Sequence, residues 1–474
     1  MNTLESLRYF LPETFLICGA FLALAVDLFS RNKKIVAALS LLTLALFFFL
    51  AKSHPAPAVG LSLFFGTFML DPLTQFVRYL VPAVTFITLL ASLNYRPLLK
   101  LYEGEYYVLF LFMVFGLILM GASSNLLMIF LSVEFVSILS YLMVGLLKKD
   151  ARSKEAAIKY LLFGSAASAV MLYGISLLFG ISGSLDFEAV GQAVSRPEYF
   201  SLSTLALIFF LVGLGFKISM APFHMWAPDV YEAAPTPVTA FLTVAPKAVG
   251  MIALIRVLGI ALAPLSSQWQ HILIVLSILT MTIGNLSAIA QTNIKRLIAY
   301  SSIAQAGYIL MGLAVFGSVG IQSVLIYLVT YALTNLGVFT AIIIVSNQTG
   351  SDEITSYAGL AQRAPGVAAS LTLFLISLAG IPPLAGFIGK WFVFSSTIQN
   401  GFYVLAIAAA LNSTVAAYYY FKIVKAMYLT PAETETPVLA APSLKIALGM
   451  TLLGTIIFGL APQPLIDWIQ HIRL

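Results

Sequence analysis

The chain has 474 residues, of which 60% are hydrophobic and only 9% are charged. Because an ordinary soluble domain carries about 25% charged residues, this composition indicates a polytopic membrane protein with little room for a soluble domain. The net charge of +6 does not indicate nucleic-acid binding, since the basic residues are scattered through short loops, and the single cysteine excludes an intrachain disulfide.

Apolar segments that could cross a bilayer follow one another along the whole chain. A spanning helix needs about 20 mostly apolar residues, and fourteen segments meet this requirement approximately. They are residues 10–29, 35–51, 73–93, 106–122, 124–146, 156–180, 203–224, 237–259, 271–290, 295–315, 318–345, 366–398, 401–428 and 443–462. The first is not preceded by a basic region and a cleavage site, so we expect no removed signal peptide.

Prolines interrupt several of these segments near their centres. Each of Pro222, Pro246, Pro382 and Pro383 leaves the carbonyl four residues earlier without its helical donor. In hydrocarbon such carbonyls must be paired with protein or water. The sequence therefore predicts broken seventh and twelfth helices, and hydrated cavities at the breaks beside Lys217, Lys247 and Lys390; a kink packed without water is the alternative.

The basic residues of the loops predict the orientation. Fifteen lysines and arginines follow odd-numbered helices, against four on the other side, and cytoplasmic loops generally carry the excess. We therefore predict that the first group is cytoplasmic and, with an even number of helices, that both termini lie outside. The first group is Arg31, Lys33, Lys34, Arg96, Lys100, Lys148, Lys149, Arg152, Lys154, Lys295, Arg296, Arg363, Lys422, Lys425 and Lys445; the second is Arg8, Lys52, Arg196 and Arg473.

Helices 4–8 and 9–13 form two similar blocks of five. In each block the fourth helix is interrupted and carries a buried lysine, Lys217 or Lys390. Because five is odd, the blocks would be inverted relative to each other, an arrangement typical of many transporters. We predict an all-α membrane protein with two inverted five-helix repeats. The expected division is 1–105 for helices 1–3, 106–260 for the first repeat, 261–428 for the second and 429–474 for the C-terminal helix.

Four ionisable residues lie deep in apolar sequence: Glu134, Lys217, Lys247 and Lys390. A charged side chain near the bilayer centre costs about 2.5–3.5 kcal/mol on insertion scales, so such residues usually face a protein interior or a water-filled cavity. Lys217 is the natural partner of Glu134, because opposite charges keep each other ionised. The alternatives are lysines that snorkel to the interface and a purely structural ion pair.

Two further residues, Lys159 and His224, are possible relay groups. Lys159 lies only about a turn inside the sixth helix, where snorkelling explains it nearly as well. His224 follows Lys217 by two turns of the predicted helix, on roughly the same face, and histidine titrates near neutrality; a structural role at the helix end fits equally. We expect the polar segment 300–305 to form hydrogen bonds between helices rather than line a water path, and Arg256 to snorkel.

The buried charges together suit proton transfer. A lysine desolvated in a cavity can release its proton near neutrality, and a nearby carboxylate opposes that release. The sequence contains no His/Cys metal cluster, no Walker-type loop and no GxGxxG motif. A passive membrane spacer is the alternative from a different class, but four central charges would cost it roughly 12 kcal/mol before compensation.

Several stretches resemble one family of membrane subunits. PFHMWAPDVYEAAPTPVTAFLTVAPKAVG resembles the hallmark stretch of the subunit N family of bacterial NADH-quinone oxidoreductase, respiratory complex I. SLAGIPPLAGFIGKWFVF resembles the broken helix 12 of that family, and LLMIFLSVEFVSILSYLMVG its glutamate-bearing helix 5. The resemblance covers essentially the whole chain, including the PETFLICGAFLALAVDLF opening and the fourteen-helix layout.

This resemblance implies a proton-translocating subunit of the membrane arm, with one proton channel. Carried onto this sequence, Glu134 and Lys217 would form the coupled pair, Lys247 the central relay and Lys390 the exit-side group. Lys159 matches a further basic position of the family.

The resemblance also implies where the redox chemistry takes place. FMN, iron–sulphur clusters and quinone would be bound by partner subunits, and this chain would hold no cofactor or metal and would not be catalytic in isolation. The expected neighbours are the antiporter-like subunit M and the small membrane subunits, in the bilayer of the bacterial inner membrane.

Related families remain as alternatives. Lys390 argues against the sister subunit M, which usually has glutamate at that position, and subunit L is expected to continue into a long lateral helix. Subunits of multisubunit cation/proton antiporters share the GIPPLAGFIGK pattern and are the main alternative; a membrane-bound hydrogenase subunit is a further one. VYEAAPTPVTAFL favours subunit N.

Overall fold

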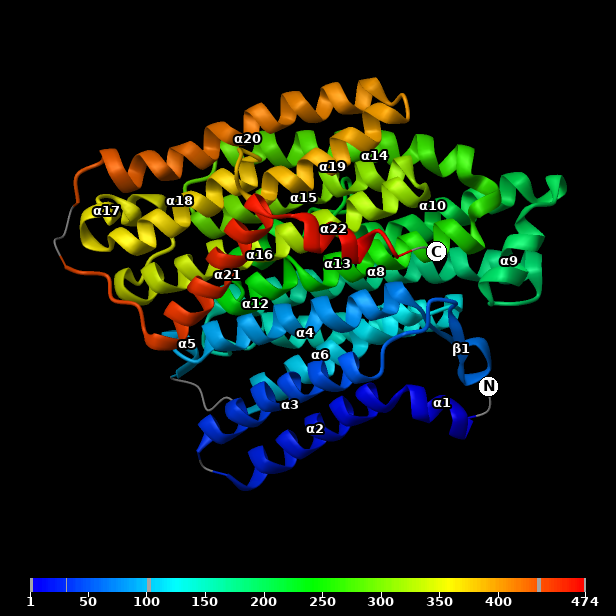
Figure 1. The fold of residues 1–474 in the computed structure, drawn as a ribbon, viewed down its shortest axis with the longest axis horizontal. Helices are drawn as coiled ribbons and strands as arrows, with labels where there is room; N and C mark the ends of the chain where they lie inside the picture. The colour runs from blue at the N-terminus through cyan, green and yellow to red at the C-terminus, as the bar shows by residue number, and fades with distance from the viewer. Residues whose placement is uncertain (1–2, 31, 100–103, 433–435, 473–474) are drawn as a thin grey trace.

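The protein is a bundle of long helices whose axes are roughly parallel or antiparallel (Figure 1). The computed structural model describes residues 3–30, 32–99, 104–432 and 436–472. Within these residues, thirteen helices are long and apolar enough to cross a membrane, and Pro365–Ala379 is a shorter apolar helix. The prediction of an all-α polytopic membrane protein is therefore confirmed.

The elements of the bundle follow the chain order. The long helices and half-helices are α2 (Leu11–Phe29), α3 (Lys33–Ser53), α4 (Pro72–Ser92), α6 (Gly104–Ala122), α7 (Leu126–Val144), α8 (Ala151–Ser182), α10 (Phe200–Lys217), α12 (Thr236–Leu242), α13 (Ala245–Arg256), α14 (Ser266–Ile289), α15 (Ile294–Val315), α16 (Gly317–Thr349), α18 (Pro365–Ala379), α19 (Ala385–Gln399), α20 (Tyr403–Leu429) and α21 (Pro442–Leu460). The short elements are α1 (Thr3–Tyr9), β1 (Leu61–Leu63), β2 (Phe68–Leu70), α5 (Arg96–Leu99), α9 (Phe187–Val194), α11 (Ala227–Ala233), α17 (Leu360–Arg363) and α22 (Gln463–Ile469).

The bundle has two ends, which we call the basic end and the opposite end. The basic end carries α5 and α17, and the opposite end carries α1, β1 and α9 (Figure 1). The blue helices α2 and α3 form one edge of the bundle, and the orange helix α20 forms the other. Three of the basic residues used to predict the orientation lie outside the described residues: Arg31, Lys100 and Arg473.

Several helices begin at side chains that satisfy the exposed backbone donors of a helix N-terminus. Asn32, Asp71, Asn125, Asp150 and Asn293 each accept a hydrogen bond from a backbone N–H of the helix that follows. Such caps typically contribute about 1 kcal/mol each. The local sequence therefore determines where these helices start, even though the membrane pattern alone leaves the ends uncertain.

The predicted breaks in the seventh and twelfth helices are confirmed. The helix α10 ends at Lys217, and the chain turns through residues 218–226 before α11 begins. In the twelfth span, α18 ends at Ala379 and is followed by Gly380, whose φ of +86° suits a residue without a side chain; α19 starts at Ala385. A further interruption separates α12 from α13 beside Pro246.

A matching backbone pattern occurs at both ends of the bundle. Asn125 bridges Asp186 at the opposite end, and Asn293 bridges Glu353 at the basic end. The flanking hydrogen bonds have the same register: Leu126 to the carbonyl of residue 185, and Ile294 to the carbonyl of residue 352. A pattern that recurs five spans later at the other end is what two inverted repeats would produce.

Two buried arginines join the N-terminal helices to the bundle. Arg78 of α4 makes a bidentate ion pair with Glu13 of α2, at 2.6 and 2.7 Å. Arg256 of α13 makes one with Asp71 at 2.8 and 2.6 Å, and it also donates to the carbonyl of Gly121. The expectation that Arg256 snorkels is wrong, because a buried carboxylate meets its guanidinium inside the protein.

Candidate functional site

Three buried lysines lie next to the helix breaks, and we call them the lysine row: Lys217, Lys247 and Lys390. Their side chains come from α10, α13 and α19, and the residues are 2%, 3% and 5% exposed. No ion pair among the described residues includes any of the three amines. Each amine is instead held by neutral oxygen atoms and aromatic rings.

Lys217 is the last residue of α10. Its amine donates a hydrogen bond to the hydroxyl of Ser137 on α7, at 3.0 Å. The side chain passes close to Gly250 of α13, where a Cβ atom would lie 2.6 Å from Ile218. Helix α13 therefore approaches the end of α10 closely because Gly250 has no side chain.

Glu134 lies one turn before Ser137 on α7, on the same helix face. Its carboxylate accepts a hydrogen bond from Ser168 of α8 rather than from Lys217. Glu134 is only half-buried, and Leu131, Phe135 and Ile138 beside it are exposed. Glu134 and Lys217 are thus close enough to share Ser137 as a neighbour but are not in direct contact.

Lys247 lies in the first turn of α13, just after the interruption beside Pro246. Its amine donates to the hydroxyl of Ser302 at 2.9 Å and to the carbonyl of Ser302 at 3.1 Å. The ring centre of Tyr231 is 5.5 Å from the same amine, a cation–π distance. A cavity of about 10 Å³ adjoins Lys247 and Tyr331, which is near the smallest volume that holds one water molecule.

Lys390 reaches back from α19 to the break that precedes it. Its amine donates to the carbonyl of Ala379 at 2.9 Å and to the hydroxyl of Ser413 at 2.8 Å. The ring centre of Tyr308 lies 4.7 Å away. The lysine therefore satisfies one of the carbonyls that the break in the twelfth helix releases.

Protein groups also pair two other released carbonyls. The hydroxyl of Tyr231 donates to the carbonyl of Leu242, and the amide of Gln305 donates to the carbonyl of Leu378. The prediction that such carbonyls find partners is confirmed for these two and for Ala379. Side chains supply those partners.

The polar segment of α15 connects the surroundings of Lys247 with those of Lys390. Ser302 holds Lys247, the neighbouring Ser301 is hydrogen-bonded to Tyr420 of α20, and Gln305 bonds to Tyr420 and Tyr327. The expectation that this segment forms hydrogen bonds between helices is confirmed. The same segment also reaches the break in the twelfth helix, where Gln305 donates to the carbonyl of Leu378.

Lys159 lies apart from the row, at the basic end. Its side chain is 40% exposed and makes ion pairs with Glu155 and Asp229. Arg296 contacts Asp229 and Glu232 from α15, at 2.7 and 2.9 Å. Although burial alone would raise the pKa of Asp229, the hydrogen bonds from Lys159 and Arg296 hold it below its ordinary value. This network fastens α11 between α8 and α15.

The prediction that His224 continues the helix of Lys217 is wrong. The helix α10 ends at Lys217, and the N–H of Met220 bonds back to the carbonyl of Gly215, five residues earlier, in a turn wider than that of an α-helix. Pro222 supplies no donor that could continue a helical ladder. His224 is 7% exposed within the irregular segment that follows, and it does not share a helix face with Lys217.

Sequence reasoning missed most of the groups that hold the row. Ser137 could have been identified from the sequence, because it follows Glu134 by one helical turn and Glu134 is the one charged residue of that segment. Tyr231, Tyr308 and Ser413 come from elements far away in the sequence. No local pattern indicates that they meet a lysine.

Comparison with known proteins identifies relatives of the whole chain. The sequence pattern described as "NADH:quinone oxidoreductase/Mrp antiporter, TM" matches residues 123–416, which include Glu134 and the lysine row. A protein of Moorella thermoacetica named NADH-quinone oxidoreductase subunit N is 44% identical over 407 residues, covering 86% of this chain and 86% of that protein.

Solved structures share the fold. A chain of respiratory complex I from Thermus thermophilus with bound aureothin matches with a TM-score of 0.82 and 30% identity, covering 96% of this chain and 98% of that chain. A chain of the Mrp complex from Dietzia sp. has a TM-score of 0.86 at 20% identity, covering 99% and 97%. The second likeness concerns the fold alone.

Proposed function

Because this chain belongs to the family of antiporter-like membrane subunits that includes subunit N of NADH-quinone oxidoreductase, we propose that it translocates protons in the membrane arm of that enzyme. Glu134 and the lysine row carry the protons. The observation that supports this most is the row itself: three lysines at most 5% exposed, none with an ion-pair partner among the described residues.

Neutral partners leave each lysine free to exist in two protonation states. An ammonium group can donate to Ser137, Ser302 or Ala379, and a neutral amine can accept a proton in the same place. An adjacent carboxylate would favour the charged state strongly. Because no carboxylate contacts these amines directly, a modest change in the surroundings is enough to move a proton along the row.

Glu134 provides the connection to the rest of the assembly. Its half-buried carboxylate lies on a flank of α7 where Leu131, Phe135 and Ile138 are exposed. A charged group that faced lipid would be costly, so a neighbouring membrane subunit covers this flank. The subunit M and the small membrane subunits are the proposed neighbours.

The redox groups belong to other subunits in this proposal. FMN, the iron–sulphur clusters and quinone react elsewhere in the complex, and electron transfer there changes the charge that Glu134 meets. The basic end faces the cytoplasm of a bacterial cell and both termini lie outside the inner membrane, as the excess of lysine and arginine at that end indicates.

The proposal is tested with Lys217→Ala in the complete complex, reconstituted in vesicles. Proton pumping and NADH-driven quinone reduction should both fall about tenfold or more, since positioned proton-transfer groups contribute about 10²–10⁴-fold in enzymes. Lys425→Ala, at an exposed lysine of α20, serves as the control. Assembly is checked for both variants.

Two outcomes would contradict the proposal. Normal pumping by an assembled Lys217→Ala complex would remove this lysine from the mechanism and favour a passive spacer. If the unmodified assembly had no NADH-driven activity, a cation/proton antiporter would be the better assignment.

A further inference from the structure

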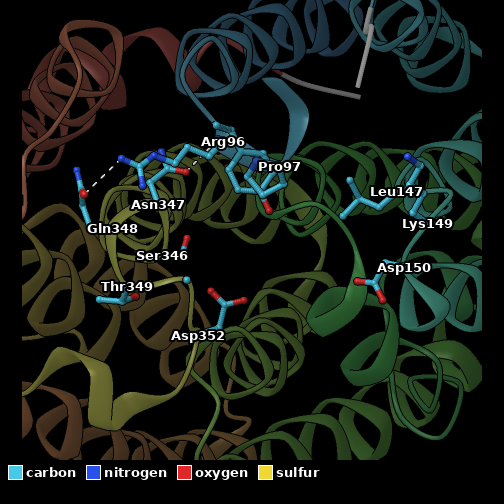
Figure 2. A pocket seen from close by; sticks show the side chains of 12 residues that line it. Arg96, Pro97, Leu147, Lys149, Asp150, Ser346, Asn347, Gln348, Thr349 and Asp352 are labelled. Carbon is cyan, nitrogen blue, oxygen red and sulfur yellow. Dashed lines mark hydrogen bonds between the residues drawn. The ribbon is translucent and has the colours of Figure 1, made fainter. Parts of the chain in front are cut away.

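A cavity of about 850 Å³ opens at the basic end of the bundle. Its walls are residues 95–97 after α4, the loop 147–150 between α7 and α8, and residues 346–352 at and after the end of α16. Figure 2 shows Asp352 and Asp150 projecting toward the space from different walls, while Arg96 is hydrogen-bonded to Asn347 and Gln348 at another side. The lining includes four charged residues, Arg96, Lys149, Asp150 and Asp352, among apolar and neutral polar ones.

Asp352 is the most unusual residue of this wall. One of its carboxylate oxygens lies 3.9 Å from the amine of Lys295. The other is buried and has no hydrogen-bond partner among the described residues. A buried carboxylate oxygen without a partner costs stability, and such an atom calls for an explanation by function or by water.

Lys295 leads from Asp352 toward the lysine row. It is 3% exposed, and its amine donates to the carbonyl of Ala234 at 2.7 Å. Tyr231, three residues earlier on α11, presents its ring to Lys247. Lys295 and Lys247 therefore contact the same short segment, residues 231–234.

The fold itself does not require a charged pair at this position. The backbone bridge at the opposite end has the same hydrogen-bond register, and there residue 185 corresponds to Asp352 and residue 127 to Lys295. Both of those residues, Leu185 and Leu127, are leucines. The same bridge is thus built with apolar side chains at one end and with an aspartate and a buried lysine at the other.

We propose that this cavity is the point where protons enter the chain, and that Asp352 receives them there and passes them to Lys295. The assignment rests on the proposed function and adds an entry site to it. A hydronium ion in the cavity protonates the Asp352 carboxylate and becomes water. The carboxylic acid then gives that proton to Lys295, once the Lys295 amine has released its own proton toward Lys247, and the carboxylate is regenerated.

The test is Asp352→Asn in the complete complex, in proteoliposomes made permeable to protons so that proton delivery rather than the gradient limits turnover. NADH-driven quinone reduction should fall about tenfold, and millimolar azide, a small weak acid that can deliver protons inside a cavity, should restore most of it. Asp352→Glu should keep at least about half of the normal rate, because it keeps a carboxyl group. The matched control is Asp150→Asn in the same cavity, which preserves the cap of α8 and should leave the rate within about twofold.

Azide rescue separates proton delivery from a structural role. A slow Asp352→Asn complex that azide does not rescue, or one that works at the normal rate, would overturn the assignment. If that variant does not assemble, the double variant Asp352→Leu/Lys295→Leu, which copies the side chains of the opposite end, takes its place. It should assemble and turn over slowly, and a normal rate would overturn the assignment.

Lys217→Ala is measured alongside to distinguish two kinds of failure. If Lys217→Ala stops turnover and Asp352→Asn does not, only the entry site is wrong. If Lys217→Ala has no effect, the proposed function itself fails.

Discussion

The lysine row and the two buried arginines are held inside the bundle in different ways. Arg78 and Arg256 each face a buried carboxylate at two distances below 3 Å, and both also donate to backbone carbonyls. Lys217, Lys247 and Lys390 have only hydroxyls, carbonyls and aromatic rings. All five are buried basic side chains, but only the arginines are neutralised by an ion pair.

The difference separates a fixed charge from an exchangeable one. Arginine remains protonated in proteins, and a bidentate carboxylate fixes its position. Lysine changes its protonation state readily when buried. The lysines also lie at helix breaks, whereas Arg78 lies inside helix α4. Burial of a charge alone therefore does not identify a functional residue; its partners do.

The largest expected effect concerns the fixed charges. Arg256→Met would leave the Asp71 carboxylate, 11% exposed, without its partner. Breaking a buried pair in this way typically costs about 3–5 kcal/mol. We expect a much lower thermal midpoint in detergent and poor assembly of the complex, measured by scanning fluorimetry and by the yield of intact complex.

The exposed Arg196, at the same end of the bundle, provides the control for that experiment. Arg196→Met should change stability by less than about 0.5 kcal/mol. Equal effects of the two substitutions would mean that the buried pair contributes no more than a surface charge, and the comparison with the lysines would lose its basis.

The next effect concerns the exchangeable charges. Lys217→Arg keeps a positive charge at the end of α10 but introduces a group that does not release its proton. We expect an assembled complex whose pumping is about tenfold slower, equivalent to about 1.4 kcal/mol of activation free energy. Pumping is measured with a pH-sensitive dye in sealed vesicles, next to Lys217→Ala. Normal pumping by the arginine variant would show that charge alone, without proton exchange, is sufficient here.

Much of this architecture could be predicted from the sequence. Apolar length predicts the spans, and proline chemistry predicts the breaks beside Pro246 and Pro382, because both depend on neighbours along the chain. The error at His224 has the same origin: a helical pattern was continued past Lys217, although the backbone turns there. Local rules work where local hydrogen bonds decide the structure.

Contacts between distant helices could not be predicted in this way. Glu134 and Lys217 are complementary charges, yet serines on α7 and α8 hold them, and the two do not meet. The pairing of Arg256 with Asp71 joins residues that are 185 positions apart. Burial and charge in the sequence identify residues that need partners, and only the packed bundle determines which partners they receive.

The smallest expected effect concerns Asp229, whose ion pairs lie at the basic end and are partly exposed to solvent. Hydrogen bonds from Lys159 and Arg296 outweigh burial and hold the pKa of Asp229 below its ordinary value. Since the folded protein binds this proton less tightly than the unfolded chain, the contribution to stability is complete above about pH 4 and disappears as the pH falls through the lower folded value. The Asp229 side chain is 37% exposed, so solvent screening keeps the contribution small.

Thermal midpoints of the wild type and of Asp229→Asn, measured between pH 3 and pH 7, should therefore differ most at neutral pH and converge at the acid end. A constant difference across this range would mean that the ionised carboxylate does not help to fasten α11, in contrast to the buried carboxylates that fix the two arginines.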